Sequence, residues 1–125
     1  MSYNGDFING RFTKVEKKDG EFKDISPADL SDMVMIVPFR HDHVDEAVMS
    51  ARKAYKKWAH TPIETRKEYL LRLKELFMSH EAEIAKAIAR DTGKPLWDST
   101  TEAKALVNKI DITINFSSKL IQEEV

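Results

Sequence analysis

The sequence of 125 residues contains no cysteine. This absence excludes disulfide bonds, thiolate zinc sites, iron–sulfur clusters and a cysteine nucleophile from these residues. The sequence also has no excess of either charge, because its 20 lysines and arginines are balanced by 21 aspartates and glutamates. A balance this close to zero argues against a basic nucleic-acid binder and against a polyanionic tail. We therefore predict no nucleic-acid partner.

Long apolar runs are absent as well. No stretch approaches the roughly 18 apolar residues that a transmembrane helix needs. Residues 1–10 lack the basic-then-apolar order of a signal peptide. We therefore expect no membrane contact and a cytoplasmic location. The share of apolar residues, 42%, together with 33% charged residues, is typical of a globular chain and not of a disordered one.

The first forty residues carry strand and turn signals. Four short segments have strand patterns: 6–8, 11–13, 21–25 and 33–37. Asn9-Gly10 separates the first two, and this pair is typical of a two-residue hairpin turn. The fourth segment is continuously apolar, which favours a buried strand, and we expect Pro38 to end it because proline lacks a ladder donor.

From His41 onward, apolar residues recur at steps of three and four, which is the helical period. Four helices are predicted, near residues 43–59, 62–78, 80–92 and 99–121. Helices would then make up about 60% of the residues, well above the usual helical fraction of a globular protein. The predicted caps are Asp42, Thr61, Ser79 and Ser99 at the helix starts and a left-handed Gly93 at the end of the third helix.

The last helix contains a conflict of periods. Residues 110–116 alternate between apolar and polar side chains, which is the period of a half-buried strand. Ile110 and Ile114 also fit a helical stripe, and no glycine, proline or turn cluster interrupts residues 102–121. We predict a helix because of that continuity.

These elements predict an α+β chain in which a β-hairpin and short strands precede four helices. Residues 1–40 would form the strands and turns, and residues 41–125 the helical part. The length allows one domain, hardly two.

Three segments resemble chemical motifs, and each has a simpler explanation. Residues 41–43, His-Asp-His, are too closely spaced for a metal site, so a solvated strand-to-helix corner is favoured. The basic cluster at 52–57 is more typical of a solvated helix face than of a phosphate-binding surface. Residues 91–95 lack the glycine spacing of a phosphate loop, so a helix end is favoured. We therefore assign no catalytic, cofactor-binding or metal-ligating residue.

Taken in order, several segments resemble the beginning of an aldehyde dehydrogenase. The matching pieces are Phe-Ile-Asn-Gly at 7–10, Ser-Pro-Ala at 26–28, Asp-Glu-Ala-Val and the stripe ending in Trp at 45–58, Arg66 with Leu70, and Asp-Thr-Gly-Lys-Pro at 91–95. Three departures are Ser26 for the usual Asn, Tyr55 for Phe and Asp91 for Glu. Each piece is weak alone, whereas the ordered set covers nearly the whole chain.

The resemblance implies a parent enzyme that uses NAD or NADP. In the family a cysteine thiolate attacks the aldehyde, because a thiolate is both a strong nucleophile and a good leaving group. That cysteine, the glutamate base and the nucleotide pocket lie later in the family's chains. The present residues would then be the N-terminal part of the α/β nucleotide-binding domain. They would be inactive alone, with no bound cofactor, and the remainder of the polypeptide would be their partner.

Within the family, residues 93–97, Glu102 and residues 108–110 resemble the branch that oxidises succinylglutamate semialdehyde in arginine breakdown. The helix that matches residues 100–121 lines the substrate tunnel in the family. The resulting tunnel candidates are Leu106, Lys109, Ile110 and Thr113, which share one face. Lys109 would attract a substrate carboxylate, although a solvated helix lysine is the favoured interpretation.

Two hypotheses about the whole chain remain open at this point. One is an N-terminal fragment of a dehydrogenase, and the alternative is a free-standing, non-catalytic helical interaction protein. The helices that start near Thr61 and Ser99 carry apolar faces wider than one neighbour can cover. We therefore predict that the isolated chain self-associates.

Overall fold

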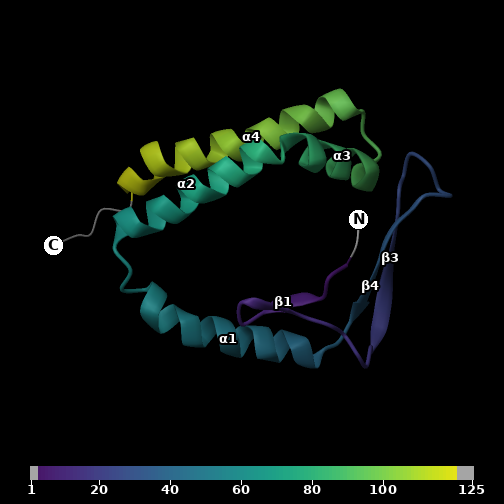
Figure 1. The fold of residues 1–125 in the computed structure, drawn as a ribbon, viewed down its shortest axis with the longest axis horizontal. Coiled ribbons are helices and arrows are strands. Elements are labelled where there is room, and N and C mark those ends of the chain that lie inside the picture. The colour runs from purple at the N-terminus through teal and green to yellow at the C-terminus, as the bar shows by residue number, and fades with distance from the viewer. Residues whose placement is uncertain (1–2, 121–125) are drawn as a thin grey trace. The chain divides into compact units, whose positions relative to one another are not determined.

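The computed structural model describes residues 3–120 (Figure 1). The chain forms two compact units, one up to Thr61 and one from Pro62 onward. The predicted division between residues 40 and 41 separates strands from helices, and it stays a prediction. Among residues 3–120, no helix combines the length and apolarity needed to cross a membrane.

The first unit opens with the predicted β-hairpin. Strand β1 (Asp6–Ile8) pairs antiparallel with β2 (Arg11–Thr13). The two residues between them have positive φ angles, 53° at Asn9 and 78° at Gly10. Such angles suit Asn-Gly because asparagine tolerates the left-handed region and glycine has no Cβ. The hairpin prediction is confirmed.

A second antiparallel pair consists of β3 (Gly20–Ile25) and β4 (Met33–Phe39). The prediction that Pro38 ends the strand is wrong, because β4 continues through it. A two-stranded sheet has only edge strands, where a missing N–H group is tolerated. The predicted burial is also wrong for most of β4: Val34 is 3% exposed, whereas Ile36 is 45% exposed.

Helix α1 (Asp42–Trp58) follows β4. The predicted cap is wrong, because Asp42 is the first helical residue and makes no cap hydrogen bond. Its carboxylate instead accepts a hydrogen bond from the Arg40 guanidinium, with 2.5 Å between Nη2 and Oδ2. The apolar stripe lies largely in solvent, with Val44 61% and Trp58 45% exposed.

The second unit contains three helices and a short 3-10 turn. These elements are α2 (Ile63–Ser79), α3 (Glu81–Thr92), α4 (Leu96–Asn115) and η1 (Ser117–Leu120). Figure 1 shows α2 and α4 side by side and antiparallel, and α4 also contacts α3. The buried residues of this unit are Ala85, Ser99, Ala103 and Ile110. Because three of these four are small, α3 and α4 can pack closely.

Three predicted N-caps in this region are wrong. Thr61 donates its hydroxyl back to the last turn of α1, and Ser79 lies inside α2 and does the same there. Ser99 lies inside α4, because that helix begins three residues earlier, directly after Pro95. Proline opens α2 and α4 because its fixed φ angle suits a helix start and its missing N–H would have no helical partner.

The end of α3 and the character of α4 agree with prediction. Gly93 has φ 73°, and its N–H donates to the carbonyl of Ala89 at 2.9 Å. Residues 110–115 are helical, which resolves the conflict of periods as predicted. Helix α4 ends at Asn115, earlier than expected, and the predicted end at residue 121 lies outside the described residues. Helices make up 59% of the described residues, so the predicted α+β class is confirmed.

The predicted burial on α2 is partly wrong. The apolar period of this segment places Ile63 and Leu73 on the face expected to be buried, yet their side chains are 49% and 39% exposed. No residue of α2 is fully buried. Leu70 and Phe77, on the same helix, are half-buried. The apolar pattern therefore identified the helix but not how much of its face the second unit covers.

Candidate functional site

The four tunnel candidates all lie on α4 but differ in burial. Leu106 is 39% exposed and Lys109 is exposed, whereas Ile110 is 6% exposed and packs inside the second unit. Thr113 is half-buried, and its hydroxyl donates to the carbonyl of Lys109 at 2.8 Å. Leu106 and Lys109 are thus accessible to a small molecule, while Ile110 serves the core.

Thr113 also lines a small cavity of about 110 Å³ within the second unit. Ile63 and Leu70 of α2 form the apolar part of its wall. A space of this size is smaller than the roughly 300 Å³ at which small-molecule pockets begin. The cavity is therefore a packing gap between α2 and α4.

An ion pair holds α4 against α2. The Lys74 amino group lies 2.8 Å from both carboxylate oxygens of Asp111. The Lys74 side chain is 26% exposed and that of Asp111 43%, so water screens the pair only in part. Asp111 follows Ile110 directly, so this contact fixes the rotation of α4 at the position where the tunnel candidates lie. No local pattern predicts this ion pair, because the partners stand 37 residues apart.

Lys94, in the loop between α3 and α4, is engaged by two carboxylates. Its amino group bonds Glu102 and lies 3.6 Å from Asp98, both on α4. The hydrogen bond to Glu102 raises the pKa of Lys94 above its ordinary value. A lysine whose positive charge is already paired with two carboxylates does not suit a phosphate group, which supports the interpretation of residues 91–95 as a helix end.

A part-buried cluster of Tyr3, Asp6 and His43 ties the first hairpin to α1. His43 is 7% exposed, and its Nδ1 lies 2.6 Å from Oδ2 of Asp6. The Tyr3 hydroxyl donates to the other oxygen, Oδ1, at 2.5 Å. The solvated corner predicted for residues 41–43 is therefore wrong at His43. The sequence could not reveal this contact, since Asp6 is 37 residues away.

These bonds shift two pKa values in opposite directions. Hydrogen bonds from Tyr3 and then from His43 lower the pKa of Asp6, because they favour the charged carboxylate. Burial, aided by the bond to Asp6, raises the pKa of Tyr3 to about 12. Both shifts favour the arrangement of neutral phenol and ionised carboxylate at neutral pH. Within residues 3–120, no group of three or more His, Cys, Asp or Glu side chains is placed to hold a metal ion.

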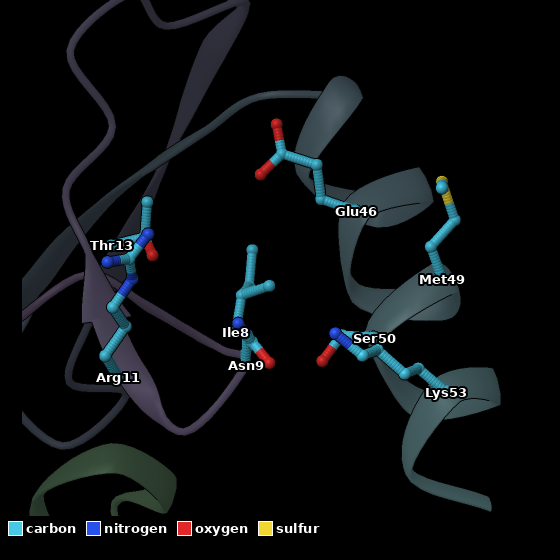
Figure 2. A pocket seen from close by; sticks show the side chains of 8 residues that line it. All are labelled: Ile8, Asn9, Arg11, Thr13, Glu46, Met49, Ser50 and Lys53. Carbon is cyan, nitrogen blue, oxygen red and sulfur yellow. The ribbon is translucent and has the colours of Figure 1, made fainter. Parts of the chain in front are cut away.

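A groove of about 460 Å³ lies between the first hairpin and α1 (Figure 2). Its walls include Ile8, Asn9 and Arg11 of the hairpin and Glu46, Met49 and Lys53 of α1. We call this space the hairpin groove. No sequence pattern predicts the hairpin groove, because its two walls are about 40 residues apart in the chain and only folding brings them together.

Comparison with known proteins places the chain in a family. The model of the aldehyde dehydrogenase family matches residues 14–125. The chain belongs to the aldehyde dehydrogenase family. This match confirms the family predicted from the ordered motifs, and it covers most of the first unit and all of the second.

Three aldehyde dehydrogenase relatives illustrate the similarity. The N-succinylglutamate 5-semialdehyde dehydrogenase of Chromobacterium violaceum is 38% identical over 109 residues, covering 86% of this chain and 22% of that protein. The same enzyme of Serratia proteamaculans is 32% identical, with 91% and 23% covered. That of Salmonella typhi is 33% identical, with 89% and 21% covered. The chain thus spans about a fifth of the length of these relatives.

Proposed function

We propose that this chain is the N-terminal part of an NAD(P)-dependent aldehyde dehydrogenase that oxidises succinylglutamate semialdehyde in arginine breakdown. The observation that carries the proposal is the similarity to N-succinylglutamate 5-semialdehyde dehydrogenases over 86–91% of the chain. The order of the motifs from Phe7 to Pro95 supports the N-terminal placement. The remainder of such an enzyme would be the partner of these residues.

The chain alone would not oxidise aldehydes. It has no cysteine to attack the substrate. In the loop at residues 91–95, Lys94 is already paired with Glu102 and Asp98, so nucleotide phosphates would compete with two carboxylates for it. The contribution of these residues would be structural: they present α4 in a fixed rotation, held by the Lys74–Asp111 pair, to the substrate path of the whole enzyme.

Complementation tests this role directly. The chain is co-expressed with the Chromobacterium violaceum relative from which the matching segment has been removed. NADH formation is then measured with succinylglutamate semialdehyde. We expect activity from the pair and none from either part alone. Saturable micromolar NAD binding by the chain alone, or no activity from a pair that assembles, would contradict the proposal. The second result would favour a free-standing interaction protein.

The same assay tests whether Lys109 attracts the substrate. We propose that its exposed amino group lies along the path of the dianionic substrate, so Lys109→Met should raise KM and leave kcat nearly unchanged. Lys104→Met is the matched control, because Lys104 is an exposed lysine of the same helix outside the candidate face. Equal KM values for both variants would identify Lys109 as an ordinary solvated lysine.

We infer further that the isolated chain associates with copies of itself. The large apolar residues of α2 and α4 that are 39–57% exposed include Leu71, Leu73, Leu76, Leu106 and Ile112. In a complete dehydrogenase, the remainder of the polypeptide would cover them. In the isolated chain a second copy is the available apolar surface, and clusters of this kind tend to find a partner.

Sedimentation velocity tests the association. We expect the mean mass to rise with concentration, and Leu76→Lys to reduce that rise because it places a charge in the contact. Leu30→Lys is the control: Leu30 is 80% exposed but lies between β3 and β4, in the other unit. A cooperatively unfolding monomer at high micromolar concentration would contradict the inference.

A further inference from the structure

The hairpin groove has the size of a ligand site. Its volume of about 460 Å³ lies within the usual range of roughly 300–1,000 Å³ for small-molecule pockets. Both walls belong to the first unit, so the groove is formed by that unit alone. Figure 2 shows the hairpin on one side and the side chains of Glu46 and Lys53 extending toward it from α1 on the other.

The two walls are fixed relative to each other. The bond of 2.6 Å between His43 and Asp6 joins the start of α1 to β1, and His43 is buried at that point. Ile8, at the end of β1, is 8% exposed and supplies an apolar surface in the middle of the groove. A ligand would therefore meet a preformed site, which lowers the entropic cost of binding.

Charge is divided along the groove. Arg11 on the hairpin and Lys53 on α1 provide two cations from opposite walls, and Glu46 provides an anion. Glu46 and Lys53 are seven residues apart, which is two helical turns on one face and about 10 Å along the axis. Figure 2 shows the side chains of Glu46 and Lys53 directed toward the hairpin, where Ile8 faces them. Opposite charges thus stand at the two ends of an apolar surface.

We propose that the hairpin groove binds a small zwitterion with an apolar middle. Its carboxylate would lie at Lys53, where a charge-assisted hydrogen bond is available, and Arg11 on the opposite wall would add attraction over a longer distance. Its ammonium would lie at Glu46, and its methylene chain would cover Ile8 and Met49. The chemical class is therefore an amino acid whose amino and carboxylate groups are separated by several methylenes. This site is separate from the substrate path proposed for α4.

Three probes of matched length separate the contributions of the ammonium and the carboxylate to binding. The ligand 6-aminohexanoate carries both charges, hexanoate lacks the ammonium, and hexylamine lacks the carboxylate. Binding to the full chain is followed by amide chemical shifts in NMR. We expect saturable binding of 6-aminohexanoate, at least tenfold weaker binding of hexanoate, and the weakest binding of hexylamine. The shifts should be confined to residues 8–13 and 46–53.

Variants of the protein then test which residue binds each end of the ligand. Lys53→Met should weaken 6-aminohexanoate at least tenfold, whereas Glu46→Gln should abolish the preference for 6-aminohexanoate over hexanoate. Lys57→Met is the matched control, because Lys57 is an exposed lysine of α1 outside the groove, and it should change nothing. Circular dichroism checks that each variant remains folded. Failure of 6-aminohexanoate to saturate at millimolar concentration, or equal losses in the Lys53 and Lys57 variants, would overturn the proposal.

Discussion

Ile110 is the position where the packing of the second unit can be tested most sharply. It is the only large side chain among the buried residues described in that unit, at 6% exposed. Replacing it with alanine removes three carbon atoms, which at about 0.8 kcal/mol each costs about 2.4 kcal/mol. A cavity term adds to this, so we expect a loss of about 3 kcal/mol from Ile110→Ala. Domains of this size are stable by only about 3–10 kcal/mol, so the effect is large.

Leu106→Ala is the matched comparison. It removes the same number of carbons from the same helix, one turn earlier, but Leu106 is 39% exposed. Water fills the space that is left, so only part of the transfer free energy is lost, about 1–1.5 kcal/mol. Urea denaturation followed by far-ultraviolet circular dichroism measures both, at concentrations where each protein sediments as a monomer.

The test is the difference between the two variants in the free energy of unfolding that each loses. If Leu106→Ala destabilised the chain as much as Ile110→Ala, the rotation of α4 described here would be wrong. Ile110 would then be free to face the substrate path with Leu106 and Lys109. A loss confined to Ile110 would instead assign this residue to the core and leave Leu106 and Lys109 as the accessible pair.

Other expected outcomes concern Gly93 and the cluster of Tyr3, Asp6 and His43. Gly93→Ala should cost about 1 kcal/mol in urea denaturation, because a Cβ is disfavoured at φ 73°, and an unchanged midpoint would contradict this. The pKa of Asp6 is lowered in the fold, so its stabilisation is complete above its ordinary value of 3.8 and is lost as pH falls below it. Asp6→Asn should therefore make the melting temperature less dependent on pH in the acid range. The pKa of Tyr3 is raised to about 12, so its stabilisation is complete below pH 10 and is lost as pH rises through 12, which ultraviolet titration of the phenols measures.

The predictable parts of the fold depend on local chemistry. Asn9-Gly10 and Gly93 were predicted correctly because a positive φ angle is a property of single residues. The N-caps failed for a physical reason. Serine and threonine hydroxyls can also donate to a carbonyl one turn earlier, as Thr61 and Ser99 do here, so their presence does not locate a helix start.

The contacts that shape the candidate sites were not predictable. Lys74–Asp111 and His43–Asp6 each join partners 37 residues apart, and neither partner has a local signature. A lysine at helical spacing has the same pattern whether it pairs across helices or points into water. The hairpin groove is hidden for the same reason, since its cations lie on two elements that meet only in the fold.

Apolar periodicity also has a definite limit as a guide to burial. A stripe at steps of three and four predicts a helix because the period is a property of the segment itself. Which neighbour covers the stripe depends on the rest of the molecule. Leu73 and Leu76 follow the pattern of buried residues, yet they are 39% and 57% exposed. The relatives are between four and five times as long as the matched segment, which covers 22% of the Chromobacterium violaceum protein. We have proposed that the additional residues of such an enzyme cover this face, which would explain why the sequence carries the pattern of a core that the two units do not complete.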